Sequence, residues 1–395
     1  MTVLFTVSGL LLQEILGAGT WAGMATTAIT LGSAVSATAL ASYMGRNGRR
    51  PGLVLGYMAA VIGAFLAIIG AQVALETGAA AMAILLLVGL LLMGVGQGAT
   101  NLSRYAGADL ALPEKRSQAI SLIVFGSTAG AVGGPLLVDL ANRVGDALGL
   151  AENVGPFVFT LLFFVLAGGV VFGGLRPDPL VVSGGLHDAS TGKQHNWRQG
   201  FAFIFAHPLA IVAMASLVIS QAVMVMVMAM TPLHMEAHGH EINMVGAVIS
   251  VHTAGMFAFA PLAGWVSSRV GRLPTLVMAA MILIVATIIA ALAAEATTWM
   301  MFAGLYLLGL GWSFGVVAGS ALLTESVKPD QQVAAQGSAD LLTNLASGTG
   351  ALASGIVFEE AGFHVLAMIG IAASGAMLVL TFYRYRVGTA TLAKS

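Results

Sequence analysis

The chain alternates between long apolar runs and short polar breaks. The run from Gly52 to Leu75 is apolar almost throughout, and it exceeds the ~18 residues that suggest a membrane-crossing helix. The runs are solid rather than alternating, which predicts helices instead of a barrel, because a helix satisfies its backbone hydrogen bonds within itself. The predicted segments are twelve, at roughly 2–16, 21–44, 52–75, 79–103, 118–141, 155–175, 207–230, 242–266, 275–294, 298–322, 340–358 and 364–383.

Composition indicates an all-α polytopic membrane protein whose surroundings are the lipid bilayer. Apolar residues make up 58% of the chain and charged residues only 8%, against ~25% charged in soluble domains. The chain has no cysteine, which excludes disulfides and thiolate metal sites, and its net charge of −1 gives no reason to expect a nucleic-acid partner. We expect a transporter and not an enzyme. Because the first segment is short for a bilayer, we also expect residues to be absent before Met1 or near Leu16.

The basic residues predict an orientation. If the loop 46–51 is cytoplasmic, fifteen of the sixteen Lys and Arg residues lie on the cytoplasmic side, Arg143 being the exception. This asymmetry follows the positive-inside rule, so both termini are expected in the cytoplasm. The predicted parts are a six-helix half at 1–176, a cytoplasmic linker at 177–206, a second six-helix half at 207–386 and a cytoplasmic tail at 387–395.

The two halves share short motifs. "RNGRRP" at 46–51 recurs 223 positions later as "RVGRLP" at 269–274, and "GVG" at Gly94 recurs 215 positions later as "GLG" at Gly309. Parallel repeats are typical of transporters that work by alternating access. The duplicated loop resembles the signature loop of the major facilitator superfamily, and the resemblance covers almost the whole chain. It implies the twelve-helix fold of that superfamily, although the signature's acidic residue is replaced by Gly45 in one copy and Ser268 in the other.

Charged residues near the predicted cytoplasmic ends of the helices are candidates for gating. Arg104 and Asp109, at the inner end of the fourth segment, are expected to form an intracellular ion pair. The full candidate set is Arg46, Arg49, Arg104, Asp109 and Arg269.

One window concentrates methionine and histidine. Seven of the twenty Met and four of the eight His lie between Met224 and Met256. In the seventh segment, Met224 and Met228 share one helix face, while Met226 and Met230 lie on nearly the opposite face. Methionine is also an ordinary apolar gap-filler. We therefore expect one pair to line a site and the other to pack in lipid or protein.

His252 is predicted near the middle of the eighth segment, where an ionisable side chain is costly and usually functional. A core histidine bonded to a neighbouring helix is the structural alternative. Met256 lies one turn further on, so imidazole and thioether share a face. From the outside, the predicted order of depth is Met228, Met224, His252 and Met256. These ligands, without carboxylate or thiolate, favour soft monovalent copper over magnesium, calcium or manganese.

Between these two segments, the sequence predicts an extracytoplasmic loop at 231–241. Its candidate metal-collecting cluster is His234, Met235, His238 and His240. The alternative is a simple solvated polar loop. Within the membrane, Gln221 is a further candidate polar group of a cavity.

The two motifs, Met-three-Met and His-three-Met, resemble those of the CcoA-like copper importers, and His252 follows Met224 by 28 positions. The resemblance implies inward transport of copper across the bacterial inner membrane for assembly of cbb3-type cytochrome oxidase. It implies that Met224, Met228, His252 and Met256 handle the copper. Copper is then the transported substrate. The ligand types favour Cu(I), or copper in a form reducible to it. We further expect no tightly bound cofactor, a monomer, and copper chaperones or a copper-exporting ATPase as downstream partners.

Two other functions stay open on the sequence. The first is a drug or small-metabolite exporter of the same fold, which the Gly-rich run 126–135 favours, but which leaves the Met and His window unexplained. The second is a membrane partner that binds copper without cycling. The duplicated halves argue for cycling.

Overall fold

The computed structural model describes residues 2–17, 22–185, 196–238, 242–293 and 298–392, and each predicted apolar segment is largely helical where it is described. The helices of the first part of the chain are α1 (Thr2–Leu16), α2 (Ala22–Asn47), α3 (Arg49–Thr77), α4 (Ala83–Leu110), α5 (Arg116–Leu136), α6 (Val138–Ala147), α7 (Gly155–Gly174) and α8 (Pro179–Ser183). Those of the second part are α9 (Trp197–Ala206), α10 (Pro208–Ala237), α11 (Ile242–Phe257), α12 (Ala260–Val270), α13 (Arg272–Leu292), α14 (Thr298–Ser326) and α15 (Pro329–Leu392).

Length and apolar character agree with a membrane protein. Nine helices within the described ranges are long and apolar enough to cross a bilayer. The described residues form helices and no strand, in agreement with the predicted all-α fold of two six-helix halves. Helices are the expected solution because lipid offers no hydrogen-bonding partner to an exposed backbone.

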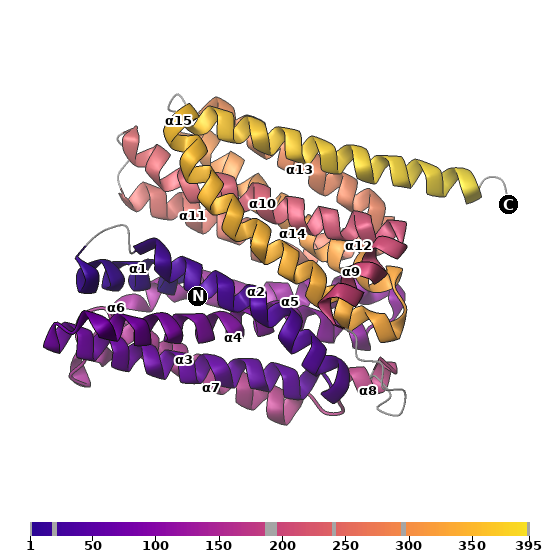
Figure 1. Ribbon diagram of the computed structural model, residues 1–395. Coiled ribbons are helices and arrows are strands. Elements are labelled where there is room, and N and C mark those ends of the chain that lie inside the picture. Colours follow the sequence, from indigo (N-terminus) through magenta and orange to yellow (C-terminus); the bar gives the residue numbers. More distant parts are fainter. Residues whose placement is uncertain (1, 18–21, 186–195, 239–241, 294–297, 393–395) are drawn as a thin grey trace. The chain divides into compact units, whose positions relative to one another are not determined.

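Four predicted segments differ from simple rods. The fifth is divided between α5 and α6, and the eighth is divided between α11 and α12. The eleventh and twelfth are joined in the long α15, which turns at Gly362, where φ is 77° and ψ is 174°. Figure 1 shows the two rods of α15 meeting at this turn. The turn confirms the gap that the sequence predicts between 358 and 364.

The duplicated loops adopt the same backbone conformation. Gly48 precedes α3 with φ 100° and ψ 166°, and Gly271 precedes α13 with φ 98° and ψ 164°. Only glycine reaches this region without strain, because it carries no Cβ. The basic-x-Gly-basic motif is therefore conserved between the halves for its backbone geometry.

The halves also share a helix crossing. In the first half, Gly94 of α4 lies against the carbonyl oxygen of Ile29 in α2. In the second, Gly309 of α14 lies against the carbonyl oxygen of His252 in α11. A Cβ at either glycine would collide with that backbone, so both crossings depend on the missing side chain. The reciprocal contacts are duplicated too, as Gly32 against the Leu91 carbonyl and Gly255 against the Tyr306 carbonyl.

By its internal contacts the chain divides into two compact units. Unit 1 comprises Met1–Ala106, Ala129–Gly200 and Pro329–Leu345, and unit 2 comprises Gly107–Thr128, Phe201–Lys328 and Ala346–Ser395. Each unit therefore includes a short piece from the other half of the sequence. The domain boundaries proposed from the sequence stay predictions. The Met and His candidates all belong to unit 2.

Candidate functional site

His252 is the best-defined polar group of the site. Its side chain is 2% exposed, and its ring Nδ1 lies 2.8 Å from the carbonyl oxygen of Leu305 in α14. A carbonyl can only accept a hydrogen bond, so Nδ1 carries the proton and Nε2 keeps its lone pair. Within the described part of the chain, that buried Nε2 has no hydrogen-bond partner. The imidazole is thus held by one nitrogen and offers the other.

Met256 lies one helical turn after His252, and Gly309 lets this stretch of α11 approach α14 closely. The Met256 Cγ is 3.2 Å from the position that a Cβ on Gly309 would occupy, and the Met256 side chain is half-buried. Any larger residue at 309 would push α11 away. The same glycine therefore brings the imidazole and the thioether against one stretch of α14.

The methionines of α10 lie on the two faces that the sequence predicts. Ser220 packs against Gly315 of α14, and Met224 and Met228 follow it at successive turns of the helix. Met224 is 7% exposed and Met228 is half-buried. On another face, the Met226 Cγ is 3.7 Å from the Cβ position of Gly350 in α15. Met226 is thus a packing residue.

The depth of the four candidate ligands can be compared by the residues of α14 that lie level with each of them. Because α10 and α14 are antiparallel, one turn from the Ser220–Gly315 contact brings Met224 level with about residue 311, and a second turn brings Met228 level with about residue 307. His252 and Met256 contact α14 at Leu305 and Gly309. By this register along α14 the ligands fall at two levels, here called tiers: Met228 is level with His252, and Met224 is level with Met256. The sequence analysis predicted four successive depths instead.

The eighth segment is interrupted next to these ligands. Helix α11 ends at Phe257, and α12 begins at Ala260. Pro261 explains the break, because proline has no N–H to donate to the Phe257 carbonyl and its ring crowds the preceding turn. Interrupted helices of this kind line binding sites in transporters, where free backbone groups are tolerated beside a cavity.

One turn beyond Gly309, Trp312 of α14 forms a cluster of aromatic and amide side chains with residues of α10 and α11. The Trp312 Nε1–H donates a hydrogen bond to the Gln221 Oε1 at 2.7 Å, and the Gln221 Nε2 lies 3.4 Å from the Ser347 Oγ. The rings of Trp312 and Phe257 meet edge to face at 5.6 Å. The sequence analysis identified Gln221 as a candidate polar group, but a lone tryptophan in an apolar helix carried no signal.

The loop predicted at 231–241 was wrong for most of its length, because α10 continues to Ala237. The helix includes Pro232, whose ring is tolerated in membrane helices when neighbouring groups satisfy the freed carbonyl. His234 and Met235 therefore lie on the last turns of a helix, and His238 follows directly. His240 lies outside the described residues.

The structure brings together part of the predicted metal-collecting cluster. The His234 ring is 6% exposed and stacks on Phe363 at 4.4 Å and against His238 at 4.3 Å. His238 is exposed, and its Nδ1 lies 2.8 Å from the His234 carbonyl oxygen. Met235 is fully buried. Two of the predicted histidines thus lie together, one of them open to the surface.

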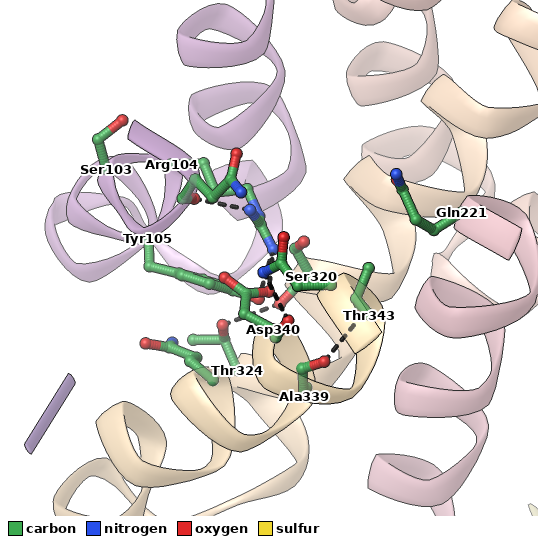
Figure 2. A network of polar contacts seen from close by, with 12 residues as sticks. Ser103, Arg104, Tyr105, Gln221, Ser320, Thr324, Ala339, Asp340 and Thr343 are labelled. Atoms are coloured by element: carbon green, nitrogen blue, oxygen red, sulfur yellow. Dashed lines mark hydrogen bonds and ion pairs between the residues drawn. The ribbon is translucent and has the colours of Figure 1, made fainter. Parts of the chain in front are cut away.

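Among the gating candidates, Arg104 has a clear partner in unit 1. The Arg104 guanidinium is 2.5 Å from the Asp340 carboxylate of α15, and it also donates to the Tyr105 hydroxyl at 3.0 Å and the Asn101 carbonyl at 2.6 Å. Figure 2 shows the guanidinium and the carboxylate facing each other. The sequence analysis expected Asp109 as the partner; Asp109 is buried further along α4. Burying this charge is tolerable because it is paired and hydrogen-bonded.

Arg49 forms hydrogen bonds through both its side chain and its backbone. Its guanidinium is fully buried and donates to the Gln336 Oε1 at 2.6 Å. The backbone N–H groups of Arg49 and Arg50 donate to the Asp178 carboxylate at 3.0 and 2.7 Å. A carboxylate at a helix N-terminus is favourable, so Asp178 supplies to this loop the acid that position 45 lacks.

The remaining gating candidates lie at the surface. Arg46 is exposed on the last turn of α2. Arg269 is exposed and lies over the Trp265 ring at 5.4 Å. In the duplicated loop, Arg272 corresponds to Arg49 and forms an ion pair with Glu325 at 2.8 Å.

The described residues contain no side-chain group of the kind that holds hard metal ions such as magnesium or calcium. Among them, no three His, Asp or Glu side chains gather to form a carboxylate–imidazole metal site. A metal held by the α10 and α11 ligands would therefore meet only thioethers and one imidazole. That donor set suits a soft ion.

Comparisons with known proteins agree with the duplicated architecture. The profile of the Major Facilitator Superfamily matches residues 1–245 and 213–394. The chain is 33% identical to the MFS-type transporter YddS of Bacillus subtilis over 96% of this chain and 86% of that one. It is 35% identical to YdeG of the same organism, over 92% and 84%. It is also 25% identical to the riboflavin transporter RfnT of Brucella anthropi, over 86% and 80%.

Solved structures share the fold at low sequence identity. A bacterial homologue of the iron transporter ferroportin, in an outward-facing state, is 15% identical with a TM-score of 0.71 over 96% of both chains. The fucose:proton symporter FucP of E. coli is 16% identical with a TM-score of 0.71 over the same shares. The chain therefore belongs to the major facilitator superfamily, whose members are secondary transporters that work by alternating access.

Proposed function

We propose that this transporter imports copper, as Cu(I), through the site formed by Met224, Met228, His252 and Met256. The proposal places the protein in the bacterial inner membrane with both termini in the cytoplasm, where the imported copper would serve cbb3-type cytochrome oxidase. The observation that carries it is the His252 ring. One nitrogen is bound to a backbone carbonyl, and the other is buried with its lone pair unused.

This arrangement is the usual one for a metal-binding histidine. The nitrogen that does not bind metal donates to a carbonyl or carboxylate, which fixes the tautomer and the ring orientation. A purely structural histidine in an apolar region would be expected to satisfy both nitrogens, because an unpaired buried polar atom costs about 1–3 kcal/mol. The unused Nε2 is therefore better explained by a ligand than by packing.

The charge of the site favours a monovalent ion. The described parts of α10 and α11 that bear the ligands carry no acidic residue near them, and the sequence has none between Pro208 and Met235 or between Asn243 and Val270. Four neutral ligands leave the whole charge of the ion uncompensated, and that cost is greater for a divalent ion. Thioether and imidazole also prefer Cu(I).

Uptake of radioactive copper tests the proposal. Proteoliposomes containing the wild-type protein should accumulate reduced copper, and those containing His252→Ala should not. His207→Ala is the matched control, since His207 lies between α9 and α10, away from the proposed ligands, and its ring Nδ1 lies 2.8 Å from the Phe203 carbonyl oxygen. Equal accumulation by wild type and His252→Ala would refute the proposal. Binding without accumulation would instead indicate a copper-binding partner that does not cycle.

A second candidate substrate is a planar aromatic metabolite such as riboflavin. The likeness to RfnT favours this candidate substrate. A protein that carried it would be a small-metabolite transporter, one of the functions that the sequence leaves open. Stacking on the half-buried rings of Phe257 and Trp312 would suit such a ligand. Radioactive riboflavin offered to the same proteoliposomes separates the two candidates. Riboflavin uptake that is unaffected by His252→Ala would favour the metabolite.

A further inference from the structure

Trp312 lies where the two ligand-bearing helices meet α14. Its indole N–H is bound to Gln221 of α10, and its ring contacts Phe257 of α11. Gln221 precedes Met224 by three residues, and Phe257 directly follows Met256. Trp312 is therefore the next residue of α14 beyond the Met224–Met256 tier, and it is approached from both sides.

The spacing along α14 supports the same position. Gly309, which contacts Met256, precedes Trp312 by three residues, and residues three apart share a helix face. Trp312 thus projects from the face of α14 that contacts Met256 of α11, one turn beyond that contact. Its side chain is half-buried, so part of the ring is left uncovered by protein.

The orientation of the indole is fixed. The bond from Nε1 to Gln221 is short, at 2.7 Å, and the other end of the same amide lies within 3.4 Å of the Ser347 hydroxyl. The amide therefore joins α10, α14 and α15. A ring held in this way does not lose conformational freedom when an ion arrives, and such preorganisation favours binding.

The site needs a source of negative potential that its ligands do not supply. The two tiers offer only neutral thioethers and a neutral imidazole, so a bound monovalent cation keeps its full charge inside the membrane. The π face of an aromatic ring attracts a cation within about 6 Å, and the indole of tryptophan is the strongest of the three rings. This attraction increases when water is excluded.

We propose that Trp312 is a further member of the metal site, and that its indole face, held by Gln221, contacts the ion in the Met224–Met256 tier. This inference rests on the proposed copper transport. It assigns to the ring a specificity role: a π face partly compensates one positive charge, and it leaves most of the charge of a divalent ion uncompensated. Phe257 acts as a positioning residue that covers the ring from α11.

Tryptophan fluorescence tests the contact directly. The chain has five Trp, and replacing Trp21, Trp197, Trp265 and Trp299 by Phe leaves Trp312 as the only emitter. Silver(I) is a suitable probe, because it has the charge and ligand preference of Cu(I) without its oxidation. We expect saturable quenching of the Trp312 emission at one equivalent of silver. The matched control keeps only Trp265, on α12, whose emission should not change.

Substitutions at 312 measure the strength of the contact. Silver affinity, measured by calorimetry, should fall in the order Trp, Tyr, Phe and Leu, with about a tenfold loss for Trp312→Leu. Gln221→Leu changes no proposed ligand and should weaken the quenching, because the ring is no longer held. If Trp312→Leu does not fold, Gln221→Leu and Trp312→Tyr still provide the test.

The failures of this inference and of copper transport are distinguishable. Stoichiometric silver binding with unchanged Trp312 emission, and equal affinity across the substitution series, would overturn the role of Trp312 and leave copper transport standing. Absence of silver binding to the wild-type protein, with intact folding, would overturn copper transport itself. Quenching that persists in His252→Ala at unchanged affinity would also overturn the inference, because the ion would then lie elsewhere.

Discussion

The same helix crossing occurs once in each half, and the residue whose carbonyl meets the crossing glycine differs between the two copies. In the first half, Gly94 lets α4 approach the backbone of α2 at Ile29. In the second half, Gly309 lets α14 approach the backbone of α11 at His252. The offset of 223 residues between the duplicated loops relates the two residues, because 29 plus 223 is 252. An isoleucine and a histidine therefore occupy equivalent places.

The difference between Ile29 and His252 shows which side-chain properties the packing of this crossing requires and which it does not. Ile29 is 1% exposed, so an apolar side chain suffices to build this crossing. His252 is equally buried but forms one hydrogen bond and leaves one nitrogen unused. A polar group that packing does not require, at a cost that packing would avoid, is best explained by function. The comparison thus makes His252 the centre of the proposed site.

Making the second half resemble the first is the strongest test of this comparison. His252→Ile should fold normally, with a change of about 1 kcal/mol in the free energy of unfolding, since only one hydrogen bond is lost. Copper uptake into proteoliposomes should fall by at least about 100-fold. Thermal unfolding in detergent checks the stability. A His252→Ile protein that transports like wild type would show that the imidazole is dispensable.

The reverse exchange asks whether the first half tolerates the imidazole. Ile29→His should lower the free energy of unfolding by about 1–3 kcal/mol, because a polar ring replaces an apolar side chain in a packed crossing. Copper uptake should not increase, since Ser33 stands where the second half has Met256 and no thioether is available one turn away. Unfolding midpoints and uptake rates, measured beside His252→Ile, complete the cycle. An unchanged midpoint would mean that the two crossings are less alike than their glycine contacts indicate.

The methionines sharpen the comparison with a smaller effect. Leu replaces a packing Met at a cost usually under about 1.5 kcal/mol, but it offers no lone pair to an ion. Met228→Leu and Met256→Leu should each reduce copper uptake roughly tenfold, with normal expression. Met226→Leu, on the α15 side, is the matched control and should leave uptake unchanged. Uptake reduced equally in all three variants would assign the methionines to packing.

Much of the fold follows from pattern alone. Solid apolar runs predict helices because lipid leaves the backbone no other partner, and each run is largely helical where the structure describes it. Helix boundaries were misplaced near two prolines for local reasons. Pro261 breaks the eighth segment within an otherwise apolar run, and Pro232 does not end α10, because neighbouring groups in a membrane protein can satisfy the carbonyl that proline frees.

The candidate site was predictable only as a list of residue types. Spacing places Met224 with Met228 and His252 with Met256, because i and i+4 positions share a helix face. Spacing cannot reveal which carbonyl receives the His252 proton or how two antiparallel helices are aligned. Those depend on contacts with α14 at Leu305, Gly309 and Gly315. These residues are remote in sequence, since Leu305 follows His252 by 53 residues. The partner of Arg104 was missed for the same reason, since Asp340 lies 236 residues away.

The smallest expected effect comes from the histidines at the end of α10. His238 is exposed, while the His234 ring is buried between His238 and Phe363. Replacing His234, His238 and His240 together by Ala removes ligands that water and the deeper tiers partly replace. Uptake should therefore fall a few-fold when copper is scarce and approach the wild-type rate when copper is abundant. Initial rates measured across a range of copper concentrations distinguish the two regimes, with His364→Ala as a control. A variant that is inactive at every concentration would mean that the two tiers between α10 and α11 do not suffice, and that the contrast between His252 and Ile29 captures only part of the transport path.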